Sequence, residues 1–263
     1  MGGYVNIIEL KNISLKYEDK SILDDISMTI QNNSVHVILG PSGAGKSTIL
    51  KVILGLLQVD DGEVIIDEKE INSLNEQQVL NLRRKMGFVF QGNALFDSLT
   101  VAENTAYFLS YFTNKNEEQI NQKVKEILSF VNLSGSEDLY PDELSGGMKK
   151  RLAIARALAT DPQIILFDEP TTGLDPINSK AILNLIKKLQ GAGTTSVIVT
   201  HILNDAIMIG DTLTVINEGK VVISGSVIEI LQSSDRFIKD FFYEINDNMF
   251  LSNKIKSECY ERV

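Results

Sequence analysis

Residues 40–48 read GPSGAGKST and contain the pattern G-x-x-x-x-G-K-[ST]. The stretch before them, SVHVILG, is compact and apolar like a buried strand, and the stretch after them, KSTILKVILGLL, has the length and apolar spacing of a helix. A strand, a glycine loop and a helix in this order are the context in which the pattern predicts a phosphate-binding loop. Glycines let successive backbone N–H groups point into one concavity, and the helix dipole favours an anion there.

The loop pattern also predicts which atoms would meet a nucleotide. Lys46 is expected to neutralise the terminal phosphates, and the Ser47 hydroxyl is expected to bind Mg²⁺, a hard ion that prefers oxygen ligands. The remaining loop residues expected to contact the nucleotide are Gly40, Pro41, Ser42, Gly43, Ala44, Gly45 and Thr48. A flexible turn without a ligand is the alternative, and the strand and helix on either side disfavour it.

A pair of acidic residues follows a second apolar stretch, QIILFDEP at 163–170. Its four apolar residues predict a buried strand that places Asp168 at its carboxyl end, where ligands bind in open α/β sheets. Asp168 is therefore expected to contribute a second oxygen to the metal site. Glu169, one residue further, points differently, and we expect it to polarise an attacking water. Two acidic residues in a solvated turn are the alternative.

The stretch LSGGMKKRLAIARALA at 144–159 places Ser145, Gly146 and Gly147 at the start of a helix, which makes a second place with free N–H groups for an anion. Together with the phosphate loop and the acidic pair, it makes residues 5–230 resemble the ATP-binding subunits of ABC transporters. The resemblance implies an α/β fold, the P-loop NTPase fold of ABC ATPases, with a RecA-like core, an antiparallel β subdomain and an inserted helical subdomain. It also implies a homodimer that hydrolyses ATP with Mg²⁺, in which this signature meets the γ-phosphate held by the other copy.

The same resemblance implies roles for single residues. Tyr17 matches the aromatic that stacks on adenine, with edge-strand packing as the alternative, and Gln91 matches the glutamine that contacts Mg²⁺ and the attacking water. Asp175 matches an aspartate at the subunit seam, and it also fits a helix N-cap; both roles can hold. His201 matches the histidine that touches the γ-phosphate, whereas His36 is expected to be structural. The expected catalytic set is Lys46, Gln91, Glu169 and His201, and the expected metal set is Ser47, Gln91 and Asp168.

The expected organisation is an ATPase domain at 5–232 followed by a C-terminal helical extension and tail at 233–263. Within the domain, the antiparallel β and RecA-like parts occupy 5–91 and 161–232, and the helical subdomain occupies about 92–160. SLNEQQVLNLRRKM predicts a helix with a capping box from Ser73 to Glu76 and an end at Gly87. PINSKAILNLIKKLQ predicts a helix whose apolar face carries Ile177, Ala181, Ile182, Leu185 and Leu189.

The stretch RFIKDFFYEI at 236–245 predicts an amphipathic helix. Its apolar face gathers Phe237, Ile238, Phe241, Phe242 and Ile245. We expect this face to pack on its own domain or on the second copy of the chain. Contact with a membrane is the least favoured alternative, because Asp240 and Glu244 stand on the polar side, where lipid-binding helices carry Lys and Arg.

Composition excludes several classes of protein. The chain has 263 residues, 43% hydrophobic and 23% charged, which is a globular composition. Its formal charge of −10 disfavours binding to nucleic-acid phosphates. The single cysteine, Cys259, cannot form an internal disulfide, which favours a reducing compartment. No secretion signal and no apolar run of about 18–20 residues are evident, so we expect a soluble chain.

Three stretches indicate which transporter the chain serves. Met148 stands where the family signature usually has Gln, and LSGGM, FQGNALFDSLTVAENTAYFL and FDEPTTGLDP are together similar to the ATPases of MCE-type lipid systems, the Mla phospholipid transporters in particular. This similarity implies permease subunits in the membrane, an MCE-type lipid-binding protein, a small regulatory subunit, and a location on the cytoplasmic face of the inner membrane. Leu95, Phe96 and Leu99 are expected either to meet the permease or to form subdomain core.

Two other functions stay open at this point. An importer ATPase for a small polar solute, such as an amino acid, would differ only in its membrane partner. A DNA-repair ATPase shares the motifs, but it would insert long coiled-coil arms between the phosphate loop and the signature, and this sequence has none.

Overall fold

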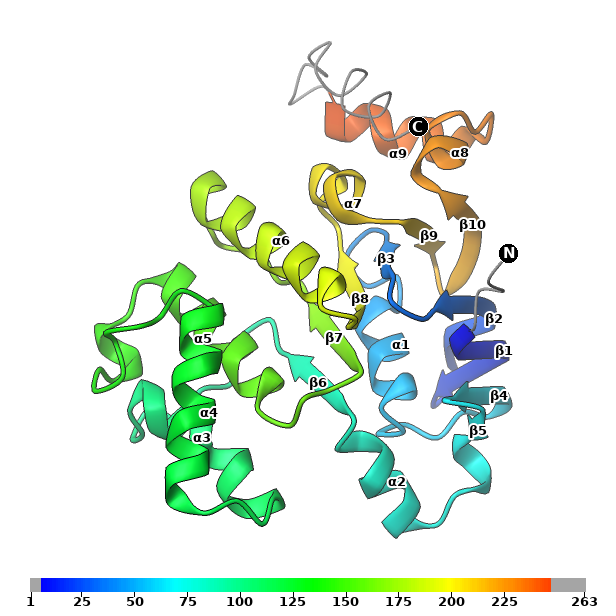
Figure 1. Ribbon diagram of the computed structural model, residues 1–263. Helices are drawn as coiled ribbons and strands as arrows, with labels where there is room; N and C mark the ends of the chain where they lie inside the picture. Colours follow the sequence, from blue (N-terminus) through cyan, green and yellow to red (C-terminus); the bar gives the residue numbers. More distant parts are fainter. Residues whose placement is uncertain (1–5, 247–263) are drawn as a thin grey trace, which may run out of the picture.

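The computed structural model describes residues 6–246, and the burial of side chains as far as Phe242. In this part of the chain, ten strands form two sheets (Figure 1). The smaller sheet has the order β2-β1-β4-β5, with β1 at Asn6–Tyr17, β2 at Lys20–Gln31, β4 at Asp61–Ile66 and β5 at Lys69–Glu70. The larger sheet has the order β10-β9-β3-β8-β7-β6, with β3 at Val35–Leu39, β6 at Met86–Val89, β7 at Ile164–Asp168, β8 at Thr195–Thr200, β9 at Thr212–Asn217 and β10 at Lys220–Ser226.

The larger sheet is parallel from β9 to β6, and only β10 pairs antiparallel. All five residues of β3 are buried, as expected for a parallel strand covered on both faces. Val37 and Leu39 belong to one buried cluster, and Ile38 between them belongs to the other. The sheet therefore separates two apolar layers, which is the α/β architecture expected from the sequence.

Nine α-helices surround the sheets in the described residues. Their bounds are α1 Lys46–Ile53, α2 Glu76–Arg83, α3 Val101–Phe112, α4 Glu117–Phe130, α5 Gly146–Leu158, α6 Pro176–Gly191, α7 Leu203–Ile209, α8 Val227–Leu231 and α9 Arg236–Asn246, with short 3₁₀ turns at Ile71–Ser73 and Pro141–Glu143. Helices α3, α4 and α5 gather on one side of the sheet, in agreement with the mainly helical content expected between residues 92 and 160 (Figure 1). Within residues 6–246, each helix is too short or too polar to cross a membrane.

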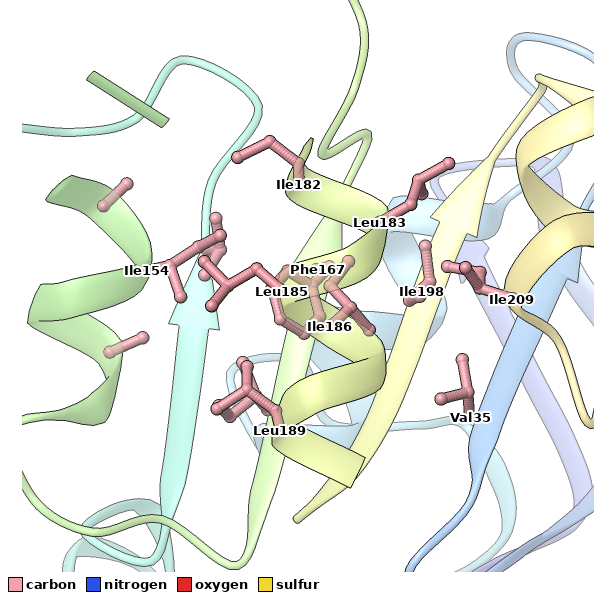
Figure 2. Close-up of a cluster of buried hydrophobic side chains, with 14 of the residues drawn as sticks. Val35, Ile154, Phe167, Ile182, Leu183, Leu185, Ile186, Leu189, Ile198 and Ile209 are labelled. Atoms are coloured by element: carbon pink, nitrogen blue, oxygen red, sulfur yellow. The ribbon is translucent and has the colours of Figure 1, made fainter. Parts of the chain in front are cut away.

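Helix α6 packs across the larger sheet through part of the face that the sequence predicts, since Ile182, Leu185 and Leu189 are buried as expected. Its buried residues are Ile182, Leu183, Leu185, Ile186 and Leu189, which meet Phe167 and Ile198 of the sheet (Figure 2). Ile177 is 83% exposed and Ala181 is also exposed, so their assignment to the apolar face is wrong. On a helix rich in apolar residues, several faces fit the period of 3.6 residues, and only packing against the sheet determines which face is buried.

The boundaries of α2 also differ from the prediction. The capping box joins Asn75 and Gln78, whose side chains each accept a bond of 2.9 Å from the backbone N–H of the other. The predicted box from Ser73 to Glu76 is therefore wrong, since the chain turns through a short 3₁₀ segment before α2 begins. Gly87 does not close the helix: it lies inside β6, where a Cβ atom would be 2.9 Å from the carbonyl oxygen of Ala157.

Helix α1 ends earlier than the apolar run after the glycine loop suggests. The run continues to Leu57, but the helix stops at Ile53, and Gly55 takes a left-handed φ of 64°. The Arg83 guanidinium binds the carbonyl oxygens of Leu54 and Gly55 at 2.8 and 2.7 Å. A partner far away in the sequence thus satisfies the end of the helix, which local patterns do not reveal.

Helix α9 packs on its own domain. Ile238 and Phe242 are 1% and 8% exposed and belong to the same buried cluster as helix α6, and Phe237 and Phe241 pack against that cluster. This agrees with the first of the two expected placements. The side chain of Ile245, Cys259 and the rest of the tail beyond residue 246 lie outside the described residues.

Candidate functional site

Four neighbouring strands of the larger sheet end at one edge. Strand β3 runs into the glycine loop, β8 into His201, β7 into Asp168 and Glu169, and β6 into Gln91. Because these strands are parallel, their carboxyl ends lie side by side. Residues up to 161 positions apart in the sequence, from 40 to 201, therefore meet at one edge of the sheet, which is where open α/β sheets bind ligands.

The glycine loop needs its glycines for close approach and for backbone conformation. A Cβ atom on Gly40 would lie 2.2 Å from the carbonyl oxygen of Ile216, and Gly45 takes a φ of 99°. Gly45 is the N-cap of α1 and has no side chain to bond the first N–H groups of that helix. These groups therefore remain donors for an anion, as the sequence pattern predicts.

Lys46 folds over its own loop. Its Nζ donates to the carbonyl oxygens of Gly40 and Pro41, each at 2.9 Å, and lies 4.0 Å from Oε1 of Glu169. Burial lowers the pKa of Lys46, while the charges of Glu169 and Asp168 raise it. Neutral carbonyl groups thus hold the ammonium group beside the loop. A negatively charged phosphate oxygen could take their place as its hydrogen-bond partner.

Ser47 and Asp168 offer a pair of oxygen atoms of the kind that Mg²⁺ prefers. The Ser47 Oγ donates to Oδ1 of Asp168 at 2.9 Å, and both side chains are half-buried. Neighbouring ligands in an octahedral magnesium site, each about 2.0–2.1 Å from the metal, lie about 2.9 Å apart. In residues 6–246, no cluster of three or more His, Cys, Asp or Glu side chains is arranged to hold a metal. The donor set fits Mg²⁺ bound together with phosphate oxygens.

Glu169 is held by three side chains. Its Oε1 lies 2.9 Å from Nδ1 of His201, and its Oε2 accepts from the hydroxyls of Thr172 at 2.9 Å and Thr200 at 3.3 Å. It is 9% exposed and takes a left-handed φ of 48°, a conformation that costs a non-glycine residue energy. Strand β7 accordingly ends at Asp168, and Glu169 does not continue it. Sequence reasoning missed Thr172 and Thr200, although both lie within three residues of an expected site residue.

Gln91 lies at the end of β6 with its side chain exposed. Its backbone carbonyl accepts a bond of 2.9 Å from Nζ of Lys150, a residue that the sequence analysis did not single out. Lys149 and Lys150 are adjacent and chemically identical, so the sequence holds no signal that only one of them is buried.

A second group of expected site residues gathers at the starts of α5 and α6. Ser145 caps α5 and accepts from the Met148 N–H at 3.3 Å. The Asp175 carboxylate caps α6 and also binds the side chain of Asn178, and these bonds lower the pKa of Asp175. Gly147 lies against Asn178, where a Cβ atom would be 2.2 Å from Oδ1. Among residues 6–246, no hydrogen bond or ion pair joins this group to Lys46, Ser47 or Glu169.

The other expected contacts are distributed around these two groups. Gly146 begins α5 and is exposed beside Ser145, whereas Tyr17 stands apart at the end of β1, 73% exposed. In the loop, Ser42 and Gly43 are exposed, and Ala44 is buried against the core. Thr48 is half-buried in the first turn of α1.

Comparisons with known proteins identify the family. The family model described as ABC transporter matches residues 23–172. The intermembrane phospholipid transport system ATP-binding protein MlaF of Haemophilus influenzae is 40% identical over 237 residues, which are 90% of each chain. The methionine import ATP-binding protein MetN of Haemophilus ducreyi is 38% identical over 247 residues, 90% of this chain and 72% of that protein.

A solved structure agrees with the sequence relatives. The dimeric, post-hydrolysis structure of the ATP-binding cassette MJ0796, bound to ADP and Pi, superposes with a TM-score of 0.76 at 35% identity, over 84% of this chain and 98% of that one. The chain belongs to the ATP-binding proteins of the ABC transporter family. It has the P-loop ABC ATPase fold, and it is an ATPase subunit.

Proposed function

We propose that this ATPase energises the movement of phospholipid or a related lipid across a bacterial envelope. The relative MlaF, named for intermembrane phospholipid transport, aligns over 90% of both chains, which supports this cargo. MetN, named for methionine import, supports a second candidate, an importer of an amino acid; the chain covers 72% of that protein. The proposed site binds nucleotide rather than cargo, so the permease would decide between the two.

The roles proposed for the site residues follow from the Ser47–Asp168 pair, which is the observation that supports the ATPase site most strongly. Mg²⁺ bound to the phosphates would supply positive charge against the developing negative charge. Ser47, Asp168 and the amide of Gln91 would hold this ion, and Lys46 and the loop N–H groups would bind the phosphates. Glu169 would accept a proton from the attacking water or orient it, and His201 would hold the γ-phosphate. Tyr17 would stack on the adenine.

We further propose that the complete site forms between two copies of the chain. The Ser145 group and the Lys46 group are separate within one chain, and each presents N–H donors at a helix start. In a head-to-tail pair, the Ser145, Gly146 and Gly147 group of one copy would meet the γ-phosphate held by the other, and Asp175 would lie at the seam. The similar cassette MJ0796 is dimeric in its ADP and Pi structure.

Mixed dimers test this arrangement. A Lys46→Ala chain and a Ser145→Arg chain are each expected to be inactive, but their mixture forms dimers with one intact site, so hydrolysis returns. The control mixes Lys46→Ala with the double variant Lys46→Ala/Ser145→Arg, because every site in that mixture lacks Lys46. A Lys46→Ala and Ser145→Arg mixture that stays at the control level contradicts a shared site.

The partner proposed for the helical side is an integral-membrane permease. Tyr111, Phe112 and Phe90 are 70%, 47% and 48% exposed near the segment after Gln91. Leu95 packs against the buried cluster, so it belongs to the core rather than to this surface. Phe96 contacts the ring of Tyr107 at 4.4 Å between centroids. The chain would thereby sit on the cytoplasmic face of the inner membrane, with an MCE-type protein and a small regulatory subunit as further partners.

We propose that the ATPase domain spans residues 5–232, with the helical subdomain at about 92–160 and the extension from 233 onward.

The cargo is tested by copurifying the chain with its permease and identifying bound molecules by mass spectrometry. Enriched phospholipid relative to a membrane protein purified in parallel supports lipid transport. An enriched free amino acid with no phospholipid supports the importer instead.

A further inference from the structure

Lys150 is a buried cation in the second turn of α5. It is 2% exposed and ranks among the largest fully buried side chains of the described chain. Placing an ammonium group in the interior is unfavourable unless hydrogen bonds compensate for the lost water. Burial lowers the pKa of Lys150 to about 8, although the charge of Asp168 raises it. The position of this residue therefore requires specific partners.

The partners are two consecutive backbone carbonyl groups. The Lys150 Nζ donates to the carbonyl oxygens of Phe90 at 3.2 Å and Gln91 at 2.9 Å. Both carbonyls lie just after the end of β6, and that of Phe90 also accepts a bond of 3.1 Å from the backbone N–H of Asn93. The bonds fix the backbone of Gln91 directly, and the free end of its side chain remains exposed.

The segment that follows Gln91 is held in the same manner by other side chains. Arg156 of α5 donates to the carbonyl oxygen of Ala94, and Asn104 of α3 donates to those of Phe96 and Leu99. Asn93 and Ala94 both take left-handed φ angles, of 64° and 51°. A segment with two strained residues in a row keeps its shape only where its surroundings determine it.

We propose that Lys150 is a positioning residue for hydrolysis: it fixes the backbone of Gln91 to helix α5, so that the Gln91 amide reaches the magnesium and water side of the site. This inference rests on the proposed function, in which Gln91 serves that site. Lys150 lies five residues after Ser145 on the same helix, about 7.5 Å along its axis. A movement of the signature at the start of α5 is thereby transmitted to Gln91 through two hydrogen bonds.

The test is a double-mutant cycle between Lys150 and Gln91, measured as ATP hydrolysis by the full chain. Lys150→Met keeps an unbranched side chain, one atom shorter, and removes its donors. It is expected to lower kcat about 10- to 100-fold, the cost of misplacing a group that positions the reacting atoms. The KM for ATP is expected to change much less, since Lys46 and the loop are intact. In a Gln91→Ala background, the same substitution is expected to cost little more.

Controls separate positioning from folding. Lys125→Met makes the same chemical change at an exposed position of α4 and is expected to leave kcat unchanged. If Lys150→Met does not fold, Lys150→Gln takes its place in the cycle. Its amide keeps N–H donors, so its kcat is expected to fall less than the range given for Lys150→Met. The melting temperature of every variant is measured alongside kcat.

The outcomes distinguish the inference from the function on which it rests. A Gln91→Ala chain as fast as the parent refutes the role of Gln91 in the proposed function, and with it the inference. A slow Gln91→Ala chain in which Lys150→Met costs the same factor again overturns the inference alone, because the two residues then act independently. An unchanged kcat for folded Lys150→Met also overturns it.

Discussion

The hydroxyl of Ser47 lies 2.9 Å from a carboxylate oxygen of Asp168. Ser47 follows the glycine loop after β3, Asp168 ends β7, and β8 lies between these two strands in the larger sheet. The two oxygens come from separate motifs, and only the parallel pairing of β3, β8 and β7 brings them together. They stand at the spacing of neighbouring ligands around Mg²⁺. The chemistry proposed for the site depends on this pair.

Ser47→Ala removes one of these oxygens while leaving the loop N–H groups in place. We expect the Mg²⁺ concentration for half-maximal hydrolysis to rise at least about tenfold, because an altered ligand shell weakens metal affinity by that order. Ser110→Ala, at an exposed serine of α3, is the control and should leave the Mg²⁺ dependence unchanged. The assignment of Ser47 fails if both variants need the same Mg²⁺ concentration as the parent.

Glu169→Gln replaces the proposed base by a neutral side chain of the same shape. Hydrolysis is expected to fall by about 10²–10⁴-fold, the contribution of general base catalysis, and ATP binding is expected to persist. The amide can still meet Thr172 and Thr200, so the fold around it should hold. Single-turnover hydrolysis and nucleotide binding are measured on the same sample, with Glu126→Gln on the exposed side of α4 as the control. Parental turnover by Glu169→Gln would refute its role.

His36 predicts a pH dependence of stability. It is buried in β3, its Nε2 lies 2.9 Å from Oγ1 of Thr214, and burial lowers its pKa to about 4. Between pH 6.5 and 4, the unfolded chain binds a proton at this histidine and the folded chain does not, so the free energy of unfolding falls as pH falls. The loss from this group reaches about 3 kcal/mol.

The His36 prediction is tested by chemical unfolding of the parent and of His36→Gln between pH 7.5 and 4.5. The parent is expected to lose stability more steeply, so the difference between the two free energies changes with pH in favour of the variant. Parallel curves over this range would show that His36 is protonated equally in both states.

Ile238→Ala tests the packing of α9 on its own domain. Removing this 1%-exposed side chain is expected to lower the free energy of unfolding by about 2–4 kcal/mol, as in other buried Ile or Leu truncations. Lys239→Ala, at the exposed next position, should cost far less. Unfolding curves and ATP-dependent dimerisation are both measured. Unchanged stability together with lost dimerisation would place the apolar face of α9 against the second copy instead.

Much of the site could be predicted from the sequence, because its residues stand at the ends of short apolar stretches. The stretches that precede Gly40, Asp168 and His201 all form strands of one sheet, and the glycine loop leads into a helix. Parallel strands buried on both faces appear in a sequence as uninterrupted apolar runs. The local sequence pattern is therefore enough to predict these strands.

Other features depend on contacts between distant segments, which a sequence does not display. Lys150 is buried and Lys149 is half-buried, although they are adjacent and identical, since only the packing of α5 against β6 separates them. Gly87 resembles a helix end, but close approach to Ala157 explains it. The buried face of α6 is likewise set by the sheet, which leaves Ile177 exposed.

The central claim is that two copies share each ATP. A structure of Glu169→Gln with Mg²⁺ and ATP measures it most directly, through the distance from Ser145 Oγ of one copy to the γ-phosphate oxygens beside Lys46 of the other. We expect a hydrogen bond, with a separation of about 2.5–3.0 Å. A closed pair in which Ser145 turns away from every terminal phosphate would contradict the claim.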